Sequence, residues 1–311
     1  MRLGPGASAR ERALFSLAGL SVGDALGERF FGPPGQTLGR IEDRWLPPPP
    51  WGYTDDTEMA LSVVQTLLEH RALDPDVLAS HLASRYDVNR GYGGGAHGLL
   101  QALRAGAPWR HAAPEMFNGT GSFGNGAAMR VAPLGAYLAD RPLEEIARQA
   151  RLSAIVTHAH AEGVAGAIAV ALAAALTWRQ AEAGELDAAR LLEAVEGGTP
   201  AGETRAGIAR AAGLGLDAPV DEAARALGTG QRVSAQDTVP FVIWCIARSL
   251  GGSLEEAFWT TVRGLGDRDT TCAMVCGVIS LGSRAIPEAW LDAREPLPGI
   301  FDPGKARSRR P

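Results

Sequence analysis

The chain has 311 residues, 46% of them hydrophobic, and a formal net charge of −5. That length allows one large core or two small domains, and the mildly acidic composition without a basic stripe argues against general nucleic-acid binding. Three cysteines without a CxxC pair exclude a disulfide scaffold, so we expect a cytoplasmic protein.

Helical periodicity dominates the chain and strand signals are nearly absent. The sequence predicts helices at 12–27, from 56 onward, and at 76–86, 96–105, 140–153, 164–178, 237–250, 253–263 and from 269 onward. Residues 47–50 form an extended segment of polyproline type. No repeat or linker divides the chain, so we predict a single all-α domain over 1–311, with flexible ends at 1–10 and 303–311.

The alanine-rich segment 164–178 is the most hydrophobic part of the sequence. A bilayer span needs about 20 residues, and this segment is shorter. We therefore predict a central core helix and no membrane association.

Two acidic clusters are the most informative feature: Thr54-Asp55-Asp56-Thr57 and Asp267-Arg268-Asp269-Thr270. Each follows a glycine and opens an apolar helical pattern. Carboxylates and hydroxyls are hard oxygen ligands of the kind that Mg²⁺ or Mn²⁺ prefers. We predict that the two clusters are halves of one metal centre.

The burial of the following helices supports this prediction. Residues 272–279 are apolar on every side, which places the second cluster at the edge of the interior. Buried carboxylates without cationic partners destabilise a fold, and a divalent cation removes that cost. The alternative is N-capping, since Asp55-x-x-Glu58 fits a capping box. A cap needs one acid, whereas each cluster carries two.

The segment 121–130 is rich in glycine and forms the second candidate site. Glycines let the backbone approach a ligand and direct N–H groups at phosphates, above all if a helix follows. A plain turn is the alternative, because Gly-Asn clusters are typical of turns. Farther along, His158 and His160 lack further ligands for zinc, and we expect His158 to form a hydrogen bond at a helix entry.

Taken in order, these motifs resemble the ADP-ribosylglycohydrolase family, which includes the dinitrogenase reductase-activating glycohydrolases. The matching segments are Gly23-Asp24-Ala25-Leu26-Gly27, Thr54-Asp55-Asp56-Thr57, Gly91-Tyr92-Gly93, Gly121 to Pro133, Thr157-His158 and Asp267-x-Asp269-Thr270. They extend from residue 14 to about residue 285, and their shared order makes the match specific.

The resemblance implies an all-α orthogonal bundle with a binuclear Mg²⁺ or Mn²⁺ centre in a cleft. The implied metal ligands are Thr54, Asp55, Asp56, Asp267, Asp269 and Thr270. The implied ligand-binding residues are Gly121, Ser122, Phe123, Gly124, Asn125, Gly126, His158, Tyr92 and Arg268. Within this set, 122–126 would hold the ADP-ribose phosphates and Phe123 would face the adenine.

Two positions depart from the family pattern. Where members commonly carry a glutamate, this chain has Phe31, and the nearest acid is Glu28. Arg268 stands where the family usually has a small residue, and its guanidinium could contact a phosphate or pair with a ligand aspartate.

The resemblance implies hydrolysis of the C1″ glycosidic bond of a mono-ADP-ribosyl group on a protein or a small molecule. Such bonds break through an oxocarbenium-like transition state. The candidate catalytic residues are Asp55, Asp56, Asp269 and Glu28. Two alternatives remain: a catalytically weak ADP-ribose binder that keeps its metals, and a structural protein on the same bundle.

Overall fold

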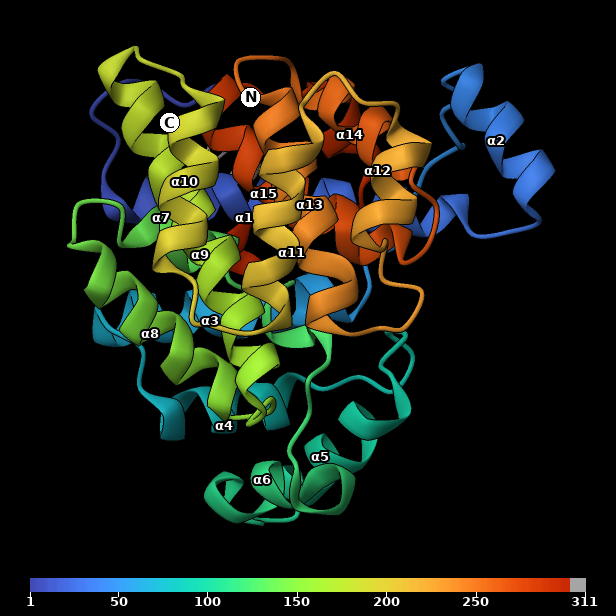
Figure 1. Cartoon of the computed structure of the whole chain (residues 1–311). Coiled ribbons are helices and arrows are strands. Elements are labelled where there is room, and N and C mark those ends of the chain that lie inside the picture. The colour runs from blue at the N-terminus through green and yellow to red at the C-terminus, as the bar shows by residue number, and fades with distance from the viewer. Residues whose placement is uncertain (303–311) are drawn as a thin grey trace, which may run out of the picture.

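The computed structural model describes residues 1–302, which form sixteen α-helices, three short 3-10 helices and isolated β-bridges (Figure 1). The all-α class is therefore confirmed. The α-helices are α1 (Ala9–Gly27), α2 (Pro34–Glu42), α3 (Asp55–His70), α4 (Pro75–Arg85), α5 (Gly94–Arg104), α6 (Trp109–Gly119), α7 (Ala132–Tyr137), α8 (Leu143–Ile155), α9 (Ala161–Ala183), α10 (Ala188–Gly198), α11 (Glu203–Leu214), α12 (Val220–Leu227), α13 (Ala235–Ser249), α14 (Leu254–Val262), α15 (Arg268–Ser283) and α16 (Glu288–Ala293).

Helices α1, α9, α13 and α15 form the centre of the molecule, and the other helices pack around them. In Figure 1, α2 projects from one side of this body, and α5 and α6 extend from another. The side chains of α1 and α15 are buried along nearly their whole lengths. They carry Asp24 and Asp269, two of the aspartates that later form the site.

Helix α9 is longer than the sequence suggested, because it covers Ala161–Ala183 and has 23 residues. Contrary to our prediction, the helix is therefore long enough to span a bilayer. By length and composition it is the one described helix that could cross a membrane, but 83% of its most apolar stretch is buried inside the protein. Its neighbours, and not lipid, cover its apolar surface.

The N-terminal residues, which we expected to be flexible, are held by hydrogen bonds. The amino group of Met1 donates to Ile286 O at 2.7 Å, and Leu3 N donates to Arg284 O at 3.0 Å. Helix α1 then begins at Ala9, earlier than predicted, behind a capping box formed by Ser8 and Glu11. The predicted C-terminal tail at 303–311 lies outside the described residues.

A row of glycines lets α1 lie directly against α15. A Cβ at Gly19 would lie 2.6 Å from Cys276 O, and one at Gly27 would lie 2.6 Å from Arg268 O. Gly23, one turn from each, meets the carbonyl of Cys272 in the same way. Real Cβ atoms do not approach backbone oxygens so closely, so this spacing depends on glycine at all three positions.

Replacing Gly23 with alanine should therefore destabilise the fold by about 1–3 kcal/mol, because the added methyl overpacks the contact between α1 and α15. Urea denaturation would measure the free energy of unfolding. Gly98→Ala is the matched control, since nothing lies within 4 Å of the added carbon in the middle of α5. The control should be neutral or slightly stabilising, and equal losses in both variants would contradict the packing argument.

Candidate metal and ligand site

The fold brings the two acidic clusters together, as the sequence predicted. The first cluster begins α3 and the second begins α15, and Thr270 Oγ1 donates to Asp56 Oδ2 at 3.3 Å. One carboxylate oxygen from each of Asp24, Asp56 and Asp269 lies within 4.8 Å of the others. Carboxylate oxygens gathered in this way are the ligand type that Mg²⁺ and similar divalent cations prefer.

Asp24 is the residue that the prediction of site residues missed. Its carboxylate accepts hydrogen bonds from the backbone N–H and hydroxyl groups of both Thr54 and Thr57, at 2.5–3.1 Å. Asp24 thus satisfies the first N–H groups of α3 from a neighbouring helix. The signal in the sequence was an aspartate beside Gly23 in an otherwise apolar helix.

The capping interpretation of the acidic clusters is wrong in its details. The N-cap of α3 is Thr54, whose side chain accepts from Asp56 N. Glu58 does not close a capping box, because its carboxylate accepts from Tyr92 Oη at 2.6 Å and from Asp87 N at 3.0 Å. Asp267 stands at the N-cap position of α15 without a side-chain cap hydrogen bond. The acids are therefore available for another role.

Two carboxylate oxygens at the site, Asp56 Oδ1 and Asp269 Oδ1, are buried and have no hydrogen-bond partner. Burial, reinforced by neighbouring negative charges, raises the pKa of both groups well above the usual value. It also raises the pKa of Asp55 to about 8, with Asp24 as the next cause. Unpartnered oxygens and crowded negative charge fit a divalent cation, so the residues present suit the metal that the resemblance implied.

Arg268 does not neutralise this charge through a direct contact. Its guanidinium lies 5.0 Å from the centroid of the Phe31 ring, and Nε is buried without a hydrogen-bond partner. Among residues 1–302, no ion pair joins it to Asp267 or Asp269. The pairing with a ligand aspartate that we considered from the sequence is therefore not formed.

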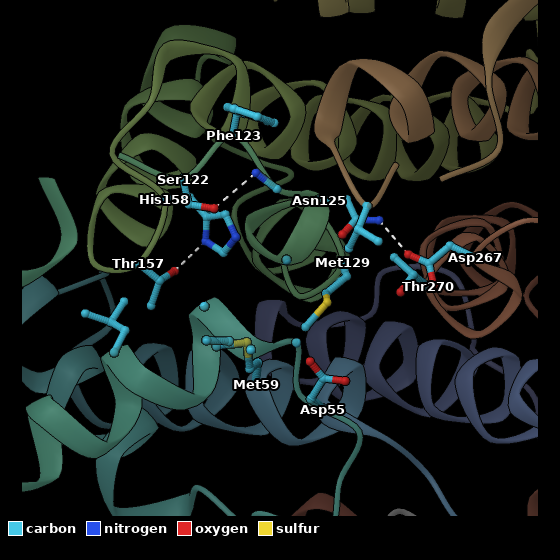
Figure 2. Close-up of a pocket in the computed structure, with 18 of the residues that line it drawn as sticks. Asp55, Met59, Ser122, Phe123, Asn125, Met129, Thr157, His158, Asp267 and Thr270 are labelled. Atoms are coloured by element: carbon cyan, nitrogen blue, oxygen red, sulfur yellow. Dashed lines mark hydrogen bonds between the residues drawn. The ribbon is translucent and has the colours of Figure 1, made fainter. Parts of the chain in front are cut away.

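A cavity of about 500 Å³ lies beside the acidic residues, within the size range of small-molecule sites. Figure 2 shows Asp55 on one side of it, Asp267 and Thr270 on another, and Ser122, His158 and Phe123 farther along. The predicted site residues that line it are Asp55, Ser122, Phe123, Gly124, Asn125, Gly126, His158, Asp267, Asp269 and Thr270. Those that do not line it are Glu28, Thr54, Asp56, Tyr92, Gly121 and Arg268.

The glycine-rich segment, defined here as the glycine loop 121–126, is a turn against the cavity. Ser122 Oγ accepts from Gly124 N at 3.2 Å, and a single 3-10 turn follows at Asn125–Ala127. The α-helix that would strengthen phosphate binding does not follow directly, since α7 begins only at Ala132. The turn interpretation is thus correct for the backbone, and the loop still faces the cavity.

Asn125 joins the glycine loop to the second acidic cluster. Its side-chain amide donates to Asp267 Oδ2 at 2.7 Å (Figure 2). It also donates to Thr238 Oγ1 at 3.1 Å. The amide thereby holds one carboxylate oxygen of Asp267 in place. These contacts use the amide for the protein itself, which differs from the phosphate-binding role predicted for Asn125.

The ring of His158 packs against the backbone of the glycine loop. A Cβ at Gly126 would lie 3.0 Å from His158 Cε1, and one at Gly124 would lie 3.2 Å from Nε2. Nδ1 is 2.7 Å from Thr157 Oγ1, and burial lowers the pKa of His158 to about 3, so the ring is neutral. The N-cap of α9 is His160 rather than His158.

Two aromatic predictions have different outcomes. Phe123 is 42% exposed at the cavity, where its ring stacks on that of Phe117 with centroids 6.4 Å apart. Tyr92 is buried with its hydroxyl on Glu58, behind the cavity wall formed by Gly91 and Gly93. The ring of Phe123 is accessible to a ligand. Tyr92 is not, and its hydrogen bond to Glu58 anchors the segment whose glycines line the cavity.

Phe31 stands where the resemblance implied a glutamate, and Glu28 is the nearest acid to it along the chain. Both side chains are exposed. Phe31 is 44% exposed and covers Arg268. Glu28 lies on the 3-10 helix that follows α1, and partial desolvation, then the charge of Asp24, raises the pKa of its carboxyl group. Neither side chain lines the cavity in this conformation.

The raised pKa values predict how the metal-free protein responds to pH. The carboxyl groups of Asp55, Asp56 and Asp269 titrate higher in the folded protein than the value of about 3.9 in an unfolded chain. Their contribution to stability is therefore complete below about pH 4 and is lost as the pH rises through the folded values. The melting temperature of chelated protein should fall between about pH 5 and pH 8, and Mg²⁺ should reverse much of that fall.

The matched variant for this measurement is Asp56→Asn, which keeps an acceptor for Thr54 and Thr270 but carries no charge. It should weaken both the pH dependence and the response to Mg²⁺. An unchanged pH dependence in this variant would show that the acidic cluster does not limit the stability of the metal-free fold.

Comparisons with known proteins identify the family. The model of the ADP-ribosylglycohydrolase family matches residues 5–304. "ADP-ribosylhydrolase ARH3" of Bos taurus is 33% identical over 285 residues, covering 78% of this chain and 74% of the relative. The Homo sapiens protein of the same name is 33% identical over 275 residues and likewise covers 78% of this chain and 74% of the relative. A solved structure titled "ADP-ribosylglycohydrolase-related protein complex" has a TM-score of 0.65 and 27% identity, and covers 93% of each chain. The acidic helix starts, the glycine loop and these matches together show that the chain belongs to the ADP-ribosylglycohydrolase family of hydrolases.

Proposed function

We propose that this protein hydrolyses the C1″ glycosidic bond of mono-ADP-ribosylated proteins or small molecules and releases ADP-ribose, with two Mg²⁺ or Mn²⁺ ions as cofactors. The observation that carries the proposal is the convergence of five aspartates, from α1, the start of α3 and the N-cap and first turn of α15, beside a cavity with a glycine loop. The relatives named ADP-ribosylhydrolase support the same reaction class.

The residues suited to hold the cations are Asp55, Asp56, Asp267, Asp269, Thr54 and Thr270. Asp56 and Asp269 support this assignment because each has a buried oxygen without a partner. Asp24 is close enough to share a cation with them, although its oxygens already accept several hydrogen bonds. When bound, the cations would orient the ribose hydroxyls and make a nearby water more acidic.

The side chains and backbone of the protein would then accept the proton and bind the rest of the ligand. Asp55 and Asp269 line the cavity, so either carboxylate is placed to accept a proton from the attacking water. The glycine loop would hold the diphosphate, with the neutral ring of His158 fixing its backbone. Because Phe123 belongs to this loop and its side chain is exposed at the cavity, its ring would meet the adenine face.

A catalytically weak ADP-ribose binder is the second candidate, and one observation favours it. Phe31 occupies the usual glutamate position and packs on Arg268, so no carboxylate enters the cavity from that segment. Glu28 is the nearest acid along the chain, and its side chain does not line the cavity. This candidate predicts binding of ADP-ribose without turnover.

The proposal is tested by measuring release of free ADP-ribose from arginine-linked and serine-linked substrates. Reactions would contain Mg²⁺, Mn²⁺ or a chelator, beside the double variant Asp55→Ala/Asp56→Ala. We expect metal-dependent release that the double variant loses, with helical content by circular dichroism unchanged. Tight ADP-ribose binding without release from any substrate would favour the binder, and release that persists with chelator would contradict the metal assignment.

Replacing Phe123 with alanine should weaken ADP-ribose binding by about 1–3 kcal/mol, the usual contribution of a base stacked on an aromatic ring. Calorimetry would measure the dissociation constant. Trp45→Ala serves as the control, since Trp45 is similarly exposed, at 39%, and does not line the cavity. An unchanged affinity in Phe123→Ala would remove this ring from the binding site.

A further inference from the structure

The charged residues that line the cavity are unevenly distributed. Asp55, Asp267 and Asp269 form the acidic end, and Arg232 is the one cationic side chain among the described lining residues. A ligand with a diphosphate is repelled by carboxylates and attracted by a guanidinium. The position of Arg232 therefore bears directly on how an anionic ligand enters.

The turn that carries Arg232 is held on both sides. On one side, Gly230 N donates to Asp237 O at 2.8 Å, and Arg232 N donates to Asp237 Oδ2 at 2.9 Å. On the other, Val233 O accepts from Asn125 N at 3.2 Å. The backbone of Arg232 is thus fixed between the first turn of α13 and the glycine loop.

Val233, the next residue, has an unfavourable backbone conformation. Its φ is +53°, in the left-handed region that a β-branched residue rarely adopts, and its side chain is 58% exposed. No burial of the side chain offsets this strain. Strained residues of this kind concentrate at binding sites, where the surroundings hold a particular backbone direction.

The side chain of Arg232 is available for a ligand. It is exposed, and among residues 1–302 no carboxylate forms an ion pair with it. The glycine loop carries no charged side chain, and several of its N–H groups already donate within the protein. Only a short 3-10 turn follows it, so a helix dipole adds little there.

We propose that Arg232 binds the diphosphate of ADP-ribose and supplies the positive charge that the glycine loop lacks. The inference rests on the proposed function, because it names a further contact in the same site. A guanidinium can donate two parallel hydrogen bonds to a phosphate, which also fixes its orientation. Arg232 is a binding and positioning residue and takes no part in bond cleavage.

The test compares dissociation constants for ADP-ribose and for adenosine, which lacks the diphosphate. Calorimetry would be run on the wild-type protein, Arg232→Gln, Arg232→Lys and Arg225→Gln. Arg225 is the matched control, because it is an exposed arginine on neighbouring α12 outside this cavity and its loss changes the net charge equally.

In Arg232→Gln we expect affinity for ADP-ribose to fall about tenfold while affinity for adenosine stays the same. Arg232→Lys should lose less, and Arg225→Gln should match the wild type. Binding by the wild type should also weaken more steeply with salt than binding by Arg232→Gln.

Equal ADP-ribose affinity in Arg232→Gln and Arg225→Gln would overturn the inference. A parallel loss for adenosine would overturn it as well, since the effect would then not involve the diphosphate. Failure of the proposed function is distinguishable: a protein that binds ADP-ribose through Arg232 but releases none from any substrate keeps this inference and refutes the hydrolase.

Discussion

The close contact between α1 and α15 is the constraint on which the site depends. Glycines spaced one turn apart on α1 remove the side chains that would otherwise separate the two helices. Asp24 follows the middle glycine and therefore lies against the first turn of α15, which carries Asp269. Because Asp24 also accepts hydrogen bonds from Thr54 and Thr57, the same contact determines where α3 begins.

The aspartates at the site differ in how far their oxygens are already satisfied. Asp24 has donors on both oxygens, so its carboxylate mainly organises the start of α3. Asp56 and Asp269 each keep a buried oxygen without a partner, a state that is costly unless a cation or a proton occupies it. The hydrogen-bond pattern thus separates a carboxylate that builds the site from those that are free to bind.

Helical periodicity was enough to predict the all-α class and the long helices, and paired acids at two helix starts were enough to predict their meeting. Short helices were missed where propensity is weak, as in α2, which contains Gly35 and Gly39. The role of Asp24 could not be predicted because no local pattern shows that its donors, about 30 residues away in sequence, pack against α1. For the same reason, nothing local indicated that Arg232 and the glycine loop share one cavity.

The side chain of Asn125 has a consequence for cooperativity. It belongs to the glycine loop that lines the cavity, yet it donates to an oxygen of Asp267 in the acidic cluster. Any ligand that shifts this loop changes the hydrogen bonding of a carboxylate suited to a cation. Thermodynamic linkage then requires the effect to be mutual: if nucleotide occupancy strengthens cation binding by some factor, the cation strengthens nucleotide binding by the same factor. The Asn125 amide is thus the direct hydrogen-bonded link between the glycine loop and the acidic cluster through which such coupling would act.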